Sequence, residues 1–102
     1  MYRARDRIEH SEWLERLDTA GVELGLSQSV RSTATDLFLS HIPDEERSKP
    51  AVAAASLYAA ALIGGEERSQ PAVADTFDVS RLSIQSRWKR LLEDAGFRPP
   101  SW

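Results

Sequence analysis

Along the first half of the chain, apolar and polar positions follow the period of an amphipathic α-helix. Apolar side chains recur every three or four residues from about Arg7 to Leu24, and again from about Gln28 to His41. Between the two segments lies "GLS", in which glycine tolerates a left-handed helix stop and Ser27 can cap the next helix. The predicted buried positions are Trp13, Leu17, Ala20 and Leu24 in the first helix, and Val30, Ala34, Leu37, Phe38 and Ile42 in the second.

A third helix is predicted in "SKPAVAAASLYAAALIGG", which is apolar on nearly every side. Ser48 is its expected N-cap, and Pro50 falls in the first turn, where the missing N–H costs nothing. The preceding "PDEER" is expected to be a solvated loop, and Gly64-Gly65 ends the helix. Because helices that are apolar all round lie inside bundles, this segment is expected to be the hub of the fold.

Two more helices are predicted toward the C-terminus. A short one covers about Pro71 to Phe77, capped by Ser69 or Gln70, and a longer one starts at Ser80 and ends near Ala95. No alternating β-branched run and no hairpin dipeptide occurs in the sequence, so the fold class is all-α with five helices. The apolar line of the last helix is predicted to be Ile84, Trp88, Leu91, Leu92 and Ala95.

Residues at about 70–95 meet the steric demands of a helix-turn-helix. The first helix needs a small residue where the second crosses it, and Ala74 fills that place. Four residues later the chain must turn sharply, and Asp78 tolerates the left-handed backbone that such a turn uses. Val79 then fills the turn, and Ile84 anchors the second helix in the core. Ser80 is expected to cap that helix.

The outward side of this last helix is basic, although the whole chain carries a net charge of −3. No acidic residue occurs between Asp78 and Glu93. Glutamine can pair bidentately with adenine, and arginine with guanine or a phosphate, so the helix is a candidate DNA-binding element. The candidate DNA-binding residues are Ser80, Arg81, Leu82, Ser83, Gln85, Ser86, Arg87, Lys89 and Arg90.

Other chemistry finds little support in the sequence. There is no cysteine, and the two histidines lack a ligand spacing, so no metal and no cofactor are predicted. The Ser-x-x-Lys match at 86–89 has no partner motif, and no enzymatic activity is predicted. The paired carboxylates at 44–46 and 66–67 and the acidic face of the first helix are interpreted as solvated surface, with binding of a basic partner surface as the alternative for the acidic face. The longest apolar run is too short to span a bilayer, which predicts a soluble, cytoplasmic protein.

The stretch "RSKPAVAAASLYAAALIGGEERSQPAVADTFDVSRLSIQSRWKRLL" resembles the cyclin-like repeat of archaeal and eukaryotic transcription initiation factor IIB. The resemblance lies in the Arg-Ser loop, the alanine-rich helix with its Leu-Tyr pair, and the segments "SQPAVA" and "VSRLSIQSRWKRL". It implies a five-helix cyclin-like fold that binds promoter DNA and the TATA-binding protein. The base-contacting positions implied by the family match Leu82 and Gln85, where the family often has arginine in place of Gln85.

The resemblance departs from the full-length family in two ways: there is no zinc ribbon and no second repeat. We therefore expect one cyclin-like domain at 1–97, a short proline-rich tail at 98–102, and a stand-alone protein rather than an excised repeat. The predicted function is a nucleoid-associated, DNA-binding transcription regulator or accessory initiation factor. The alternative is a protein-interaction module that binds the TATA-binding protein or another transcription factor without reading DNA.

Two questions stay open at this level. One is whether the chain forms a homodimer. The other is the origin of its acidic, lysine-poor composition, which suits the salt-rich cytoplasm of a halophilic archaeon but follows equally from GC-rich codon usage.

Overall fold

The computed structural model describes residues 10–97, and all regular structure in this range is helical. No strand occurs between residues 10 and 97, so the all-α prediction is confirmed. The predicted start of the first helix near Arg7 and the tail at 98–102 lie outside the described residues. The elements are α2 (Ser11–Glu23), α3 (Gln28–Ser40), the 3-10 helix η1 (Glu46–Ser48), α4 (Lys49–Ile63), α5 (Gln70–Thr76), α6 (Arg81–Gln85) and α7 (Trp88–Asp94).

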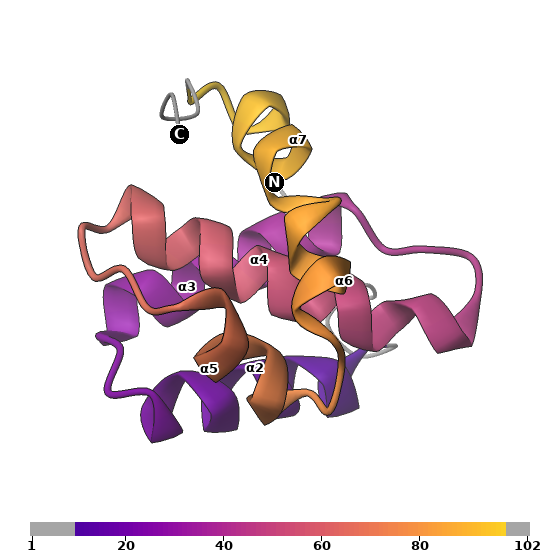
Figure 1. Ribbon diagram of the computed structural model, residues 1–102, viewed down its shortest axis with the longest axis horizontal. Coiled ribbons are helices and arrows are strands. Elements are labelled where there is room, and N and C mark those ends of the chain that lie inside the picture. Colours follow the sequence, from indigo (N-terminus) through magenta and orange to yellow (C-terminus); the bar gives the residue numbers. More distant parts are fainter. Residues whose placement is uncertain (1–9, 98–102) are drawn as a thin grey trace.

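Helix α4 is the hub of the bundle, as predicted. It passes through the middle of the molecule and is in contact with all the other α-helices (Figure 1). Every residue from Ala51 to Ala61 is buried. The alanines allow close approach by neighbouring helices, and apolar burial on this scale is the main favourable term in folding.

Close approach is also found where the end of α4 meets the start of α3. A Cβ atom placed on Gly64 would lie 2.5 Å from Cγ2 of Val30. The backbone of Gly64 has φ −84°, which any residue can adopt. Glycine is therefore required at this position for space rather than for backbone freedom.

Two pairs of aromatic rings pack between helices in the core. The rings of Trp13 and Phe38 join α2 to α3, with their centroids 6.2 Å apart. The rings of Tyr58 and Trp88 join α4 to α7 edge-on, with their centroids 5.5 Å apart. Such pairs add about 0.5–1.5 kcal/mol beyond area burial. The predicted core positions of the first two helices are buried, except that Leu24 and Ile42 are only partly buried against the core.

The prediction of one continuous last helix was wrong, because the chain breaks between α6 and α7 at Ser86 and Arg87. The backbone N–H of Arg87 donates to Ile84 O at 3.0 Å, three residues back rather than four. The carbonyl of Ser83 instead accepts from the guanidinium of Arg87 at 3.0 Å and lies 3.5 Å from the Ser86 hydroxyl. These side chains thus compete with the backbone for the acceptor that a regular helix would use.

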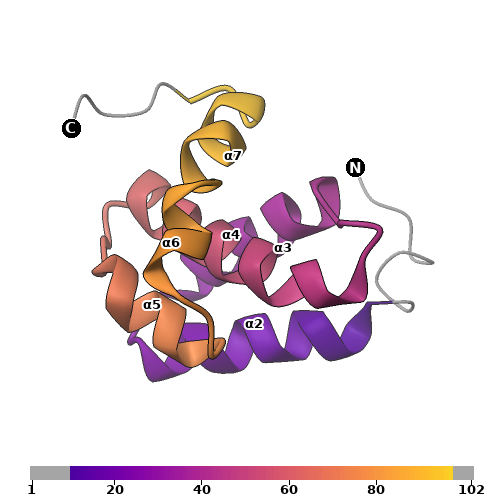
Figure 2. The same cartoon turned by 45° about the vertical axis from the view of Figure 1, so that its right-hand side comes forward.

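The break gives α7 a direction of its own. In Figures 1 and 2, α7 extends beyond the body of the bundle, whereas α6 lies across α4. Trp88, Leu91 and Leu92 of α7 are buried as predicted. Ala95 is exposed, contrary to the prediction, because α7 ends at Asp94 and the chain turns through Gly96 at φ 89°.

The serine caps divide into two groups. Ser27 caps α3 by accepting from Val30 N at 3.3 Å, and Ser69 caps α5 by accepting from Ala72 N at 3.2 Å, which decides between Ser69 and Gln70. Ser48 and Ser80 occupy N-cap positions but their hydroxyls make no capping bond. For Ser48 the reason is backbone geometry: η1 runs directly into α4, so this residue is already helical.

The loop between α4 and α5 is not merely solvated, contrary to the interpretation of its carboxylate pair. Glu66 Oε1 accepts from Ser27 N at 2.8 Å, directly at the start of α3. Arg68 Nε donates to Leu24 O at 2.8 Å, at the end of α2. The loop therefore joins the α2–α3 connection to the rest of the bundle. In the 44–46 group, Glu46 likewise contacts Lys49 at 2.9 Å and Trp13 Nε1 at 3.3 Å.

Candidate nucleic-acid interface

The turn between α5 and α6 has the geometry that the sequence predicted. Ala74 is buried where α6 crosses α5, and Ile84 is completely buried. Asp78 has φ 55°, the only positive φ of a non-glycine residue in the part of the chain that the structure describes. The N–H of Val79 donates to Ala74 O at 3.1 Å and closes the turn. Helix α6 is thereby held across α5 with one side in the core and the other in solvent.

The solvent side of α6 presents mixed chemistry. Arg81, Leu82 and Gln85 are exposed, and Leu82 has 64% of its surface accessible. Ser80 and Ser86, at either end of α6, are exposed, whereas Ser83 is half-buried.

Of the predicted cations on α7 and the break, two point to solvent. Lys89 is exposed, and its Nζ lies 5.6 Å from the Trp88 ring centroid. Arg90 has an 87% exposed side chain, with Nε 3.9 Å from Asp94 Oδ2. Arg87 differs: it is half-buried, and its Nη1 donates to Ser83 O at 3.0 Å and Ser86 Oγ at 3.1 Å. The guanidinium of Arg87 therefore stabilises the break between α6 and α7.

We call the exposed cations Arg81, Lys89 and Arg90 the basic face. In a straight helix, residues 81, 85 and 89 would form a single stripe, since positions four apart share one side. The break divides that stripe, because Arg81 and Gln85 lie on α6 whereas Lys89 and Arg90 lie on α7. Sequence reasoning placed the candidate residues on one helix and missed this division; the serines at 83 and 86 were the local signal for it.

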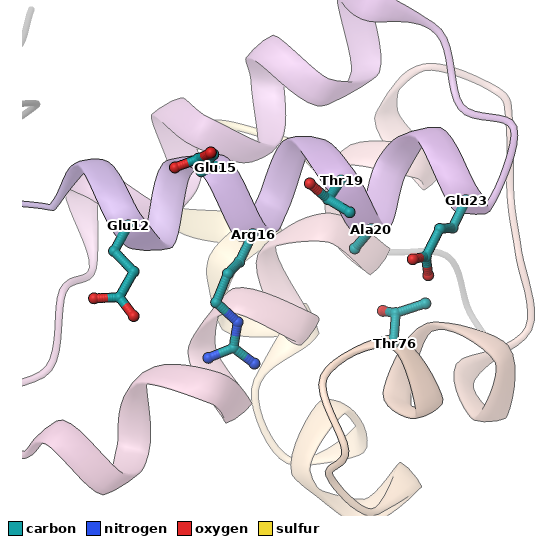
Figure 3. A pocket seen from close by; sticks show the side chains of 7 residues that line it. All are labelled: Glu12, Glu15, Arg16, Thr19, Ala20, Glu23 and Thr76. Carbon is teal, nitrogen blue, oxygen red and sulfur yellow. The ribbon is translucent and has the colours of Figure 1, made fainter.

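On another side of the molecule, α2 and α5 enclose an acidic pocket of about 290 Å³ (Figure 3). Arg16 lies within it, its guanidinium carbon 4.3 Å from the Trp13 ring centroid. The sequence marked α2 as acidic, but it could not show that Thr76 of α5 completes a concave surface. We call this the acidic pocket; its lining residues are Glu12, Glu15, Arg16, Thr19, Ala20, Glu23 and Thr76.

Between residues 10 and 97 there is no group of three or more acidic or histidine side chains placed to hold a metal ion. In the same range, no helix is long and apolar enough to cross a bilayer.

Comparison with known proteins defines the class. The model of the transcription factor TFIIB repeat matches residues 14–94, and the chain belongs to this family. The resemblance seen in the sequence is confirmed, and with it the cyclin-like all-α fold.

Three archaeal relatives support the same assignment. Transcription initiation factor IIB of Pyrococcus abyssi is 35% identical over 81 residues, which is 76% of this chain and 27% of the relative. The protein of the same name from Pyrococcus horikoshii matches to the same extent. Transcription initiation factor IIB 2 of Thermococcus kodakarensis is 31% identical over 90 residues, 85% of this chain and 29% of the relative. The chain thus spans between a quarter and a third of the length of these relatives.

Proposed function

We propose that this chain acts in transcription initiation or its regulation by binding duplex promoter DNA, and that α6 with the start of α7 forms the contact surface. The observation that carries the proposal is the basic face: three exposed cations follow the α5–α6 turn, with no acid between Asp78 and Glu93. The family membership and the initiation-factor names of the relatives support it.

Each predicted residue has a role suited to its chemistry. On α6, Arg81 and Gln85 can donate to base edges, and Leu82 can contact a thymine methyl group. Lys89 and Arg90 suit phosphate oxygens, which position a protein without reading sequence. The hydroxyls of Ser80, Ser83 and Ser86 can donate to the same phosphate oxygens, from shorter side chains. Arg87 contributes through the break that it stabilises and through its remaining N–H groups.

The charge of the chain limits its affinity when it acts alone. With a net charge of −3, the domain depends on a few local cations, and each phosphate contact loses strength as salt rises. Attachment to a second DNA-bound protein would raise the effective concentration at the promoter. The TATA-binding protein is the partner we propose for this purpose; a homodimer would serve the same end. We propose on this basis that the protein associates with the nucleoid in the cytoplasm.

The proposal is tested by fluorescence anisotropy with duplex promoter DNA at a series of salt concentrations. The parent should bind at about 50 mM salt, and the logarithm of its affinity should fall linearly with the logarithm of salt concentration. Replacing one phosphate-contacting cation, as in Lys89→Ala, should reduce that slope by about 0.9. The variant Arg81→Ala/Lys89→Ala/Arg90→Ala should lose binding.

Arg47→Ala is the matched control, since Arg47 has an 85% exposed side chain on η1, outside α6 and α7, where it pairs with Glu45. It should bind like the parent. The DNA-binding proposal fails if the parent does not bind at low salt, or if the triple variant binds as tightly as Arg47→Ala.

The acidic pocket favours a second candidate function, a protein-interaction module. Three carboxylates around one arginine make a concave, negatively charged surface that suits a basic partner segment. In this case the TATA-binding protein or another transcription factor would be bound through α2. The variant Glu12→Gln/Glu15→Gln/Glu23→Gln would then lose that partner in a pull-down and retain its affinity for DNA. Loss of both properties, or of neither, would count against it.

A further inference from the structure

The direction of α7 is not set by α6, because the helix break separates them. The backbone hydrogen-bond ladder is irregular at Arg87 and resumes with Leu91 N donating to Arg87 O at 3.2 Å. Beyond the break, α7 is held by its buried apolar residues and by a polar contact at its far end. That contact joins Asp94, the last residue of α7, to His41 at the end of α3.

His41 is held from both sides of its ring. Nδ1 lies 2.9 Å from Leu37 O, and Nε2 lies 3.0 Å from Asp94 Oδ2. Both partners are acceptors, so the ring satisfies both contacts only when each nitrogen carries a proton. The His41 side chain is 23% exposed, and the bond to Leu37 already fixes its orientation. The usual entropic cost of ordering a surface ion pair is therefore reduced.

The carboxylate oxygen of Asp94 that contacts His41 also lies near the basic face. Asp94 Oδ2 is 3.9 Å from Nε of Arg90, so one oxygen lies between the histidine of α3 and a cation of α7. Next to the break between α6 and α7, His41, Arg87 and Arg90 line a pocket of about 380 Å³. Without the contact with His41, Asp94 would destabilise α7, because a carboxylate at the C-terminal end of a helix interacts unfavourably with the helix dipole. The contact with His41 offsets that disadvantage.

Geometry makes this contact sensitive to the direction of α7. A helix of seven residues is about 10 Å long, so a swing of about 10° at the break would move Asp94 by about 2 Å. A displacement of that size would separate Asp94 from His41 beyond hydrogen-bonding distance. The pair can therefore exist only in a narrow range of α7 directions.

We propose that His41 and Asp94 are positioning residues for DNA binding: their contact holds α7, and with it Lys89 and Arg90, in one direction relative to Arg81 of α6. This inference rests on the proposed function. The contact can shift the population of α7 directions by no more than its own free energy, which for a pair of this kind corresponds to at most about fivefold in affinity.

The charge of Asp94 and its proposed positioning role predict opposite effects of one substitution on DNA affinity. Asp94→Asn removes a negative charge beside the basic face, so electrostatics alone would tighten DNA binding. Loss of positioning would weaken it by up to about fivefold. Glu93→Gln is the matched control, because Glu93 is an exposed neighbour on α7 whose carboxylate makes no ion pair among the described residues. It should bind DNA as tightly as the parent or more tightly.

His41→Gln should also weaken binding, and the double variant should lose less than the sum of the two single effects, since the two residues act as one unit. Urea unfolding of each variant separates lost stability from lost positioning. If Asp94→Asn binds as tightly as Glu93→Gln, the inference is overturned while the proposed function stands.

A second measurement decides the inference without DNA. Residual dipolar couplings of the α7 amides, compared with those of α4, report the direction of α7 in solution. They should change in Asp94→Asn and His41→Gln and should remain as in the parent in Glu93→Gln. Unchanged couplings in all three variants overturn the inference, whether or not the parent binds DNA.

Discussion

Nε of Arg68 donates a hydrogen bond to the carbonyl oxygen of Leu24 at 2.8 Å, linking two loops that are 44 residues apart in sequence. The same guanidinium donates through Nη1 to Glu66 O at 2.9 Å and through Nη2 to Gly25 O at 3.4 Å. One side chain thus satisfies carbonyls at the end of α2 and within its own loop. Such carbonyls have no partner within a helix and need one from elsewhere.

Arg68→Ala should therefore lower the free energy of unfolding by about 1.5–3 kcal/mol, the usual range for hydrogen bonds to a charged group. Arg68→Lys should recover little of this, because an ammonium cannot reproduce the fork of donors. Urea denaturation monitored by tryptophan fluorescence measures both. Arg47→Ala serves as control and should change stability by less than about 0.5 kcal/mol. Equal stability of Arg68→Ala and Arg47→Ala would refute the role assigned to Arg68.

Gly64→Ala should destabilise the protein by about 1–3 kcal/mol, the typical cost of overpacking. The added methyl group would meet Cγ2 of the buried Val30 at 2.5 Å, at the exposed end of α4. Gly21→Ala is the comparison: its new methyl would meet Cγ of Arg31, also at 2.5 Å, but that side chain is long and can move. The helical preference of alanine then offsets most of the cost there. Thermal unfolding of both variants would contradict this account if Gly21→Ala were the less stable.

Asp78→Gly should leave stability unchanged or raise it by up to about 1 kcal/mol, because glycine adopts the φ of 55° without steric cost. Asp78→Val should lower stability by about 1–2 kcal/mol, since a β-branched residue is poorly tolerated in the left-handed region. Differential scanning calorimetry of the pair isolates the effect of the backbone. A valine variant as stable as the glycine variant would show that the turn can relax, and that Asp78 does not define it.

Acid should weaken the contact between Glu66 and Ser27. The hydrogen bonds that Glu66 accepts from the hydroxyl and backbone N–H of Ser27 hold the pKa of its carboxyl below the ordinary 4.5. A carboxyl whose pKa is lowered by folding contributes stability above its unfolded pKa and loses that contribution as pH falls through the folded pKa. The free energy of unfolding should therefore decline as pH drops below about 4.5.

Glu66→Gln should make that decline less steep, as measured by urea denaturation at a series of pH values. Glu67→Gln is the control, because the Glu67 side chain makes no hydrogen bond within residues 10–97. If both variants show the same pH dependence as the parent, the Ser27 contact does not contribute. Glu46, whose pKa is lowered by hydrogen bonds from Lys49 and Trp13, accounts for part of the decline that remains.

The sequence also indicated much of the candidate interface. Ala74, Asp78 and Ile84 each meet a steric requirement that depends only on residue type and spacing, and all three are placed as predicted. The division of the basic residues between α6 and α7 was not predicted. It depends on which donor takes the carbonyl of Ser83, and the Arg87 side chain and its backbone N–H are both close enough to compete.

By itself, the sequence determined the helices α2 to α5 and the side that each one buries, but not the division of the last segment into α6 and α7. These follow from periodicity, caps and the alanine-rich α4, which are local properties of neighbouring residues. Only the tertiary structure decided the contacts of Arg68 with Leu24 and of His41 with Asp94, which join residues 44 and 53 positions apart. Polar partners at that separation are chosen by the packing of the core, because the packed helices fix which side chains come within hydrogen-bonding distance.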